Sequence, residues 1–354
     1  MRRKRFLILI LVVSVWMGGM VALLAHFRRC ITPRVTLLPK RDIVFQEYIQ
    51  FAQVEPSGKI GFVNADGSGK TSLIVAHIEC NQEKNFYARK QLRMPFVEED
   101  KMGFLIHPQP YTIYGGRLQI YNFVKGVRLP CKLNLRSRPS PVGQQGAYVG
   151  MYQWAEDGGA VLFWPTEKAC KTRDLWSAEQ LQEMGVFQVI GFHHRGALLL
   201  LGGQVPRQYD LVSGQLTPLP WLPASCWGMI SRDDRWLACG GYVKDEQGAG
   251  RQYSIRVVSL KGGELWRERR ISGELIPSFG MGEVSWSPDG KALVYHRCRK
   301  PNPEKPKFCE ALGAENVGIY IWDLEAGKER LVTTGGVLPY WIDWSGVPSE
   351  ALTP

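Results

Sequence analysis

The sequence lacks the short motifs that mark the common metal and hydrolytic sites. Its eight cysteines include no Cys-x-x-Cys pair, and its six histidines include no His-x-His, His-x-x-x-His or His-Glu-x-x-His. Zinc ribbons and helix-borne zinc peptidase sites are therefore excluded. The chain also lacks Gly-x-Ser-x-Gly, the turn that exposes the nucleophile of many hydrolases. We expect no metal and no cofactor, while a catalytic triad assembled from distant positions stays open.

Acidic residues are absent from the first 41 positions, which hold nine of the 44 basic residues. The rest of the chain holds 35 basic and 33 acidic residues, so it carries only +2 of the formal net charge of +11. A nucleic-acid-binding domain concentrates positive charge on its folded part. We therefore expect no nucleic-acid partner.

The basic residues at the N-terminal end flank Phe6–Phe27, which contains no charged side chain. At 1.5 Å per residue, a helix of this length crosses a hydrocarbon core of about 30 Å. The segment is longer than the apolar region of a cleavable signal, and no Ala-x-Ala site follows it. We expect an uncleaved transmembrane anchor over 6–27, between a basic flank (1–5) and a basic connector (28–42). Lys and Arg lie on both sides, so charge does not decide its orientation.

Two segments near the C-terminal end have the pattern of paired β-strands. Val284–Tyr295 is an apolar strand, a tight turn and a second strand, and Gly318–Arg330 repeats this plan. Ser287-Pro288-Asp289-Gly290 fits a type I turn, in which Pro sets φ and Gly adopts the left-handed conformation. Weaker copies recur at intervals of about 40 to 50 residues, a period typical of β-propeller blades.

The strand pattern predicts an all-β, six-bladed β-propeller over residues 43–346, with seven blades as the less favoured count. Five complete four-stranded units can be counted, whereas residues 43–78 supply only three strands. The fourth strand of that blade is expected from Pro339–Trp344, because pairing the two ends of the chain would close the ring without an unpaired edge. Residues 347–354 are expected to be a tail.

Several local patterns predict further elements. Polar composition predicts a loop over Glu79–Arg93 and an inter-blade linker over Arg136–Gly146. The capping box Ser177-Ala178-Glu179-Gln180 predicts a short helix over Ala178–Met184. Gly69-Lys70-Thr71 is similar to the end of a phosphate-binding loop. A β-branched strand follows it instead of a helix, so we expect a hairpin turn there.

Trp286-Ser287-Pro288-Asp289-Gly290-Lys291, followed by Ile319-Tyr320-Ile321-Trp322-Asp323, resembles the repeat of TolB-like six-bladed propellers. Asn64-Ala65-Asp66-Gly67-Ser68-Gly69 resembles another turn of that repeat. The fourth unit lacks the Asp-Gly turn and the second lacks the Trp. The resemblance implies an extracytoplasmic propeller of a bacterial envelope that binds proteins or peptides at one tunnel mouth, without catalytic residues of its own. TolB has an additional N-terminal domain, whereas we expect only an anchor and a connector here.

Cys298 and Cys309 flank a loop rich in Pro and Lys, CRKPNPEKPKFC. Three interpretations stay open: a disulfide that restrains the loop, two unrelated buried thiols, or a metal site that includes His296. A disulfide would require an oxidising compartment. Against one acidic residue, Glu304, the loop region has five basic ones: Arg297, Arg299, Lys300, Lys305 and Lys307. They form either a solvated face or a docking loop for an acidic partner or anionic lipid headgroups.

Two classes of function fit these patterns. The first is a single-pass membrane protein whose propeller lies outside the cytoplasm, in the periplasm or at the cell surface, and acts as a protein-binding or scaffolding module. The second is a propeller enzyme, a hydrolase or lyase that acts on a peptide or glycan at the tunnel mouth. The anchor, the repeats and the basic loop favour the first, and we expect a protein partner of acidic character and no enzymatic activity. Inter-blade loops can carry an active site that no sequence motif reveals, which keeps the second open.

Overall fold

The computed structural model describes residues 37–47, 57–77, 91–107, 116–135, 138–142, 147–151, 159–192, 198–203, 205–222, 226–244, 251–277, 284–305 and 308–353. Within these ranges, none of the helices combines the length and the apolar composition that a membrane crossing requires. The expected anchor, Phe6–Phe27, lies outside them.

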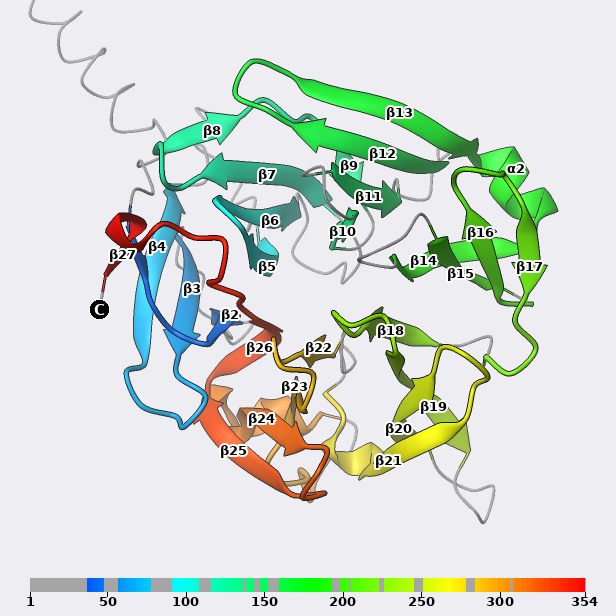
Figure 1. Ribbon diagram of the computed structural model, residues 1–354. Coiled ribbons are helices and arrows are strands. Elements are labelled where there is room, and N and C mark those ends of the chain that lie inside the picture. Colours follow the sequence, from blue (N-terminus) through cyan, green and yellow to red (C-terminus); the bar gives the residue numbers. More distant parts are fainter. Residues whose placement is uncertain are drawn as a thin grey trace, which may run out of the picture.

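Six antiparallel sheets surround a common axis like the blades of a propeller (Figure 1). Counted from the axis outward, blade 1 consists of β26 (Gly336–Trp341), β2 (Ile43–Glu47), β3 (Ser57–Val63) and β4 (Thr71–His77). Blade 2 consists of β5 (Gln91–Glu98), β6 (Lys101–His107), β7 (Gly116–Asn122) and β8 (Val127–Leu129), and β9 (Asn134–Leu135) also pairs with β7. Blade 3 consists of β10 (Ser140–Val142), β11 (Ala147–Met151), β12 (Gly159–Pro165) and β13 (Cys170–Ser177). Blade 4 consists of β14 (Val186–Phe192), β15 (Leu198–Gly203), β16 (Arg207–Asp210) and β17 (Leu216–Pro218). Blade 5 consists of β18 (Trp227–Ile230), β19 (Trp236–Lys244), β20 (Arg251–Ser259) and β21 (Leu265–Ser272). Blade 6 consists of β22 (Ser285–Trp286), β23 (Ala292–Cys298), β24 (Val317–Asp323) and β25 (Glu329–Thr334). The predicted all-β, six-bladed propeller is confirmed.

The same turn joins the two inner strands in blades 5 and 6. In blade 6 the Ser287 hydroxyl donates to Asp289, and the Gly290 amide, at φ 71°, donates to the Ser287 carbonyl. In blade 5 Ser231 bonds Asp233 in the same way, and Asp234 occupies the glycine position at φ 57°. Asp tolerates this left-handed conformation better than most residues, so the turn survives without its glycine.

The ring closes within blade 1, where a strand from the C-terminal end pairs with one from the N-terminal end. β26 is antiparallel to β2, with Val44 opposite Tyr340 and Ile43 opposite Trp341. The Ile342 amide extends the pairing by donating to the Asp42 carbonyl at 2.8 Å. The strand therefore begins three residues before the Pro339–Trp344 range expected from the sequence, and it is the innermost strand of the blade.

A second pairing joins the two ends of the described chain. β1 (Leu38–Pro39) runs parallel to β27 (Leu352–Thr353), next to the short helix η5 (Ser349–Ala351). Leu38 and Ala351 are buried in the core shared by the first blades. Residues 347–354 are thus not a free tail, and the connector 28–42 takes part in the fold from Leu38 onward, because burial of these apolar side chains fixes both segments.

Three other local expectations can be compared with the structure. The capping box predicted at Ser177 is present and begins helix α2 (Ala178–Glu183), with the Gln180 amide donating to the Ser177 hydroxyl. Strand β5 begins at Gln91, inside the range expected to be a loop. Strand β10 occupies Ser140–Val142, where a linker was expected. Both are inner strands of their blades, and tertiary pairing with β6 and β11 outweighs their polar or proline-containing composition.

A repeated Phe–Gly contact brings the inner strands of blades 1 and 2 close to their neighbours. Phe45 lies opposite Gly61, and Phe96 lies opposite Gly103. A Cβ added at Gly61 would be 2.0 Å from the Phe45 ring, and one at Gly103 would be 2.2 Å from the Phe96 ring. Glycine is required here by close approach, because both rings are fully buried on the strand surface.

Candidate functional site

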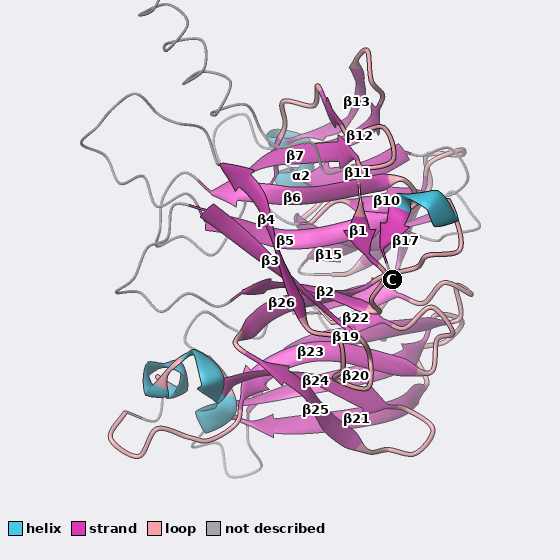
Figure 2. Cartoon of the chain, turned by 90° about the vertical axis from the view of Figure 1, so that its left-hand side faces the viewer, coloured by secondary structure: helices cyan, strands magenta, loops and turns pink. Residues whose placement is uncertain are grey.

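A long excursion leaves blade 6 between β23 and β24. It contains the short helices η3 (Cys309–Leu312) and η4 (Ala314–Asn316), and Figure 2 shows it projecting from one face of the ring. A disulfide joins Cys298 to Cys309, with their Cα atoms 6.1 Å apart. The sulfur atoms and a Glu310 carboxylate oxygen lie within 4.8 Å of one another. Because the two sulfur atoms are joined in the disulfide, neither is available as a thiolate ligand for a metal ion.

Two buried asparagine side chains hold the excursion in shape. Asn316 accepts from the Lys300 amide and donates to the carbonyls of Lys300 and Cys309, at 3.1, 2.9 and 2.6 Å. Asn302 accepts from the amides of Glu304 and Lys305 at 3.0 and 3.3 Å. These bonds replace the strand pairing that the excursion lacks, so its described backbone is fixed by side chains rather than by a sheet.

The excursion presents basic and apolar side chains together. Arg299, Lys300 and Lys305 are exposed, while Lys307 lies outside the described residues. Phe308 is 49% exposed and Leu312 is 42% exposed, so the excursion carries two of the eight exposed large apolar side chains in the described part of the chain. A surface that combines such apolar groups with cations has the chemistry of a binding patch for an anionic partner.

Arg297 does not lie on the excursion with the other basic residues of the expected docking loop. It belongs to β23, is half-buried, and its guanidinium carbon lies 3.9 Å from the centre of the Tyr320 ring. It also pairs with Glu329 at 2.7 Å, and Arg269 of blade 5 reaches the same carboxylate at 2.7 Å. Burial opposes ionisation of Glu329, but hydrogen bonds from Arg297 and Tyr295 hold its pKa below the ordinary value. Arg297 therefore connects β23 to β24 and β25 within blade 6, and Arg269 joins blade 5 to the same carboxylate. Arg297 is not available for docking.

His296, considered with the two cysteines as a metal ligand, faces the closing strand. It is fully buried, and its Nδ1 accepts a hydrogen bond from the Leu338 amide at 3.3 Å. This contact joins β23 of blade 6 to β26 of blade 1. The histidine thus supports the closure of the ring.

A second group of charged side chains gathers where inner strands approach the axis. Glu98 ends β5, Arg232 follows β18, and Asp343 follows β26. Arg232 forms an ion pair with Asp343, and its Nη2 atom lies 3.9 Å from Oε2 of Glu98. Tyr340 of β26 donates its hydroxyl to Glu98, and the Arg138 guanidinium carbon lies 4.5 Å from the centre of the Tyr340 ring.

Burial dominates the electrostatics of this axial group. It raises the pKa of Glu98 to about 7, while the charges of Arg232 and Arg138 act in the opposite direction. Burial also raises the pKa of Tyr148, a neighbour that Glu98 affects through its charge. No sequence pattern predicted this site, because its members come from four blades and share no motif.

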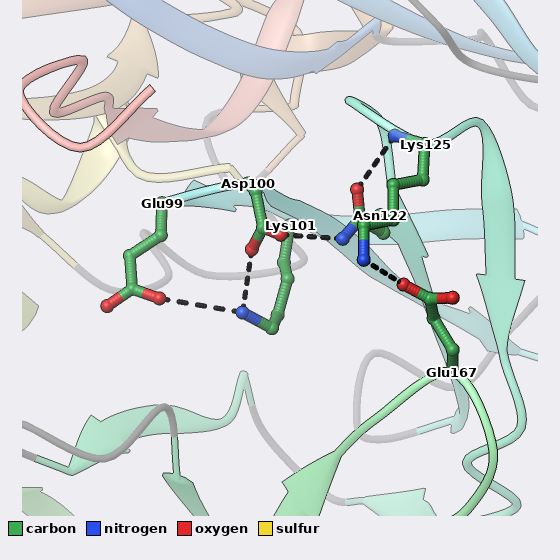
Figure 3. A network of polar contacts seen from close by, with 6 residues as sticks. All are labelled: Glu99, Asp100, Lys101, Asn122, Lys125 and Glu167. Atoms are coloured by element: carbon green, nitrogen blue, oxygen red, sulfur yellow. Dashed lines mark hydrogen bonds and ion pairs between the residues drawn. The ribbon is translucent and has the colours of Figure 1, made fainter. Parts of the chain in front are cut away.

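Next to Glu98, the turn between β5 and β6 is held by a polar network (Figure 3). Lys101 donates to Asp100 at 2.7 Å, and Asn122 donates to the other oxygen of the same carboxylate at 2.6 Å. The Asn122 side chain also accepts from the Lys125 amide at 2.9 Å, and Lys125 pairs with Glu167 of blade 3. The network fixes the end of β5 and so fixes the position of Glu98.

All six cysteines in the described part of the chain form disulfides. Cys131–Cys170 joins the end of blade 2 to the outer strand of blade 3, and Cys226–Cys239 joins the residue before β18 to β19 in blade 5. With Cys298–Cys309 they are distributed over four blades. Multiple disulfides of this kind are typical of oxidising compartments.

The fold has counterparts among solved structures. TolB from Acinetobacter baumannii superposes with a TM-score of 0.56 at 11% identity, and the match covers 85% of this chain and 66% of that one, just under two thirds of its length. The chain is similar in fold to a TolB propeller. Weaker likenesses are a putative TolB from Agrobacterium tumefaciens (TM-score 0.42, 13% identity, 73% of this chain and 86% of that one) and the propeller domain of the Trilobed protease from Pyrococcus furiosus (0.39, 12%, 68% and 70%). No protein-family model and no curated protein sequence matches the chain significantly. At these identities the likeness to TolB concerns the fold alone.

Proposed function

We propose that this protein is a membrane-anchored, extracytoplasmic β-propeller that binds a protein partner through the blade 6 excursion and performs no chemistry there. The observation that carries the proposal is the form of the excursion: a disulfide and two buried asparagines hold its described residues in place while Lys300, Lys305 and Phe308 remain exposed. A preorganised surface loses little conformational entropy on binding.

The compartment is inferred from two independent features. The apolar segment Phe6–Phe27 has the length of a membrane-spanning helix. The three disulfides of the propeller favour the oxidising side of that membrane. Protease added to intact spheroplasts should therefore degrade the propeller, and non-reducing peptide mapping should recover the Cys298–Cys309 pair. Protection from protease would contradict the proposed topology.

The binding test is a pull-down from solubilised membranes with the double variant Lys300→Glu, Lys305→Glu. Steering by exposed charges weakens as salt rises, because screening shortens to about 8 Å at physiological ionic strength. We expect the variant to lose the partner while its melting temperature stays near that of the wild type.

The matched control is Lys168→Glu, Lys261→Glu, which makes the same charge change on exposed turns of blades 3 and 5. It should retain the partner. Equal recovery of the partner by the wild type and both variants would mean that the excursion is only a solvated charged face. Equal loss of the partner with both variants would show that only the net charge of the propeller matters.

The axial group supports a second candidate function, a hydrolase or lyase acting on a peptide or glycan. A carboxyl group with a pKa of about 7 can accept or donate a proton at neutral pH, and Glu98 has Tyr340 and two arginines around it. Turnover of a peptide or glycan by the purified protein, abolished by Glu98→Gln, would establish this function and overturn the first proposal's exclusion of chemistry.

A further inference from the structure

Arg232 connects blades that are not neighbours in the ring. It lies in the turn after β18 of blade 5, which in a ring of six stands opposite blade 2 and two places from blade 1 (Figure 1). Its guanidinium pairs with Asp343, directly after the closing strand of blade 1, and also approaches Glu98 at the end of the inner strand of blade 2. A single side chain thus spans the axis and contacts both the closing blade and the blade opposite its own.

Glu98 is surrounded by groups from each of the elements packed against it. Tyr340 of β26 donates to its carboxylate, and Arg138, before β10, lies against the Tyr340 ring. Glu99 is its neighbour in the chain, and the like charge of Glu99 disfavours ionisation of Glu98. Tyr148 of β11 is buried beside it. The cations that can hold an ionised Glu98 in place are therefore Arg232 and Arg138.

We propose that Arg232, Glu98 and Asp343 form a proton-sensitive latch across the axis: Arg232 of blade 5 holds Glu98 of blade 2 when Glu98 is ionised and releases it when Glu98 is protonated, while Asp343 ties Arg232 to blade 1. Asp343 keeps its ion pair in both states, so the contact that changes is the one from blade 5 to blade 2. With Arg138 included, the four charges sum to zero in the latched state and to +1 after protonation.

The pKa of Glu98, raised by burial to about 7, puts this change in the neutral range. An acid whose pKa is higher in the folded than in the unfolded state takes up a proton on folding. Its contribution to stability is therefore largest below the unfolded value, near 4.5, and is lost as pH rises to about 7. Acidification should stabilise the fold through Glu98 and at the same time loosen the latch. The melting temperature should therefore rise while the distance between blades 5 and 2 becomes more broadly distributed.

The first test follows the melting temperature of the full-length protein between pH 5.5 and pH 8. The wild type should gain more stability on acidification than Glu98→Gln, which lacks the titrating group. In Arg232→Gln the midpoint of the Glu98 titration, followed by carbon-13 NMR of its carboxyl, should rise by on the order of one pH unit, because a cation that favours the ionised form is lost. Arg235→Gln, which removes an exposed arginine of the same turn, should leave the midpoint unchanged.

The second test measures the distance across the ring with spin labels. Arg128→Cys on β8 of blade 2 and Lys261→Cys in the β20–β21 turn of blade 5 place labels on exposed positions of opposite blades. In the wild-type background, the distance distribution should be narrower at pH 8 than at pH 5.5. With Glu98→Gln added, the distributions at both pH values should match the broad one. The same distribution at both pH values in the wild-type background, or a Glu98 midpoint that does not respond to Arg232→Gln, would overturn the latch.

Discussion

Replacing Ile342 by alanine tests how much of the stability depends on the closing segment. Ile342 follows β26, is 2% exposed, and packs in the core shared by the first blades. An Ile→Ala change at a buried position costs about 2–5 kcal/mol, the sum of lost burial and the cavity that remains. A domain is stable by only about 5–15 kcal/mol in total. The substitution should therefore remove a large fraction of the stability and lower the melting temperature by roughly 5–15 °C.

Urea unfolding followed by tryptophan fluorescence measures this loss, with two controls. Ile342→Val keeps most of the side chain and should cost about 0.5–1.5 kcal/mol. Leu331→Ala removes an apolar side chain that is 40% exposed on the outermost strand of blade 6, and it should cost much less than Ile342→Ala. Deleting residues 339–354 should abolish the cooperative transition. If Ile342→Ala is no more destabilising than Leu331→Ala, or the deleted protein still unfolds cooperatively, the reasoning about closure is refuted.

Three further outcomes are expected. Removing residues 347–354 should lower the melting temperature by a few degrees, because β27 and its pairing with Leu38 are lost; an unchanged value would mean that β27 contributes nothing to stability. Asn316→Ala should cost about 2–3 kcal/mol, since three hydrogen bonds of about 1 kcal/mol each are lost, and it should expose the excursion to trypsin, which Asn→Ala at an exposed site such as Asn134 should not do. The depressed pKa of Glu329 means that its stabilising contribution is present above the unfolded value and is lost as pH falls through the folded one. Acid unfolding should accordingly depend less on pH in Glu329→Gln than in the wild type, and equal profiles would exclude this contribution.

Local turn chemistry, together with the recurrence of paired strands along the chain, accounts for the parts of the fold that could be predicted from the sequence. Ser287-Pro288-Asp289-Gly290 specifies its turn without help from the rest of the chain, and the capping box at Ser177 specifies the start of α2 in the same way. The inner strands β5 and β10 were missed because pairing with neighbouring strands, and not composition, holds Pro95 and Pro141 in extended structure. In a short edge segment, periodicity is too weak a signal to reveal this.

The candidate sites divide in a similar way. The cluster of Lys and Pro between two cysteines was visible because its members are adjacent in the sequence. Tyr295 and Arg297 alternate on one face of a strand, a period of two that could have identified Arg297 as part of the sheet rather than of the loop. Glu98, Arg232 and Asp343 are far apart in the chain and meet only because the ring brings opposite blades to one axis, so one sequence alone contains no signal for them.

The parallel pairing of β1 with β27 places the two ends of the described chain side by side, so the ring could form from a chain that begins at another position. Because the two strands are parallel, Thr353 lies beside Pro39, and a linker from Thr353 to Leu37 would have to run back along this two-residue pair. New ends could then be opened at the exposed turn around Ser213 in blade 4, far from the seam of blade 1. In such a circular permutant the seam would be covalent, and the same six sheets would form from a chain that starts in a different blade.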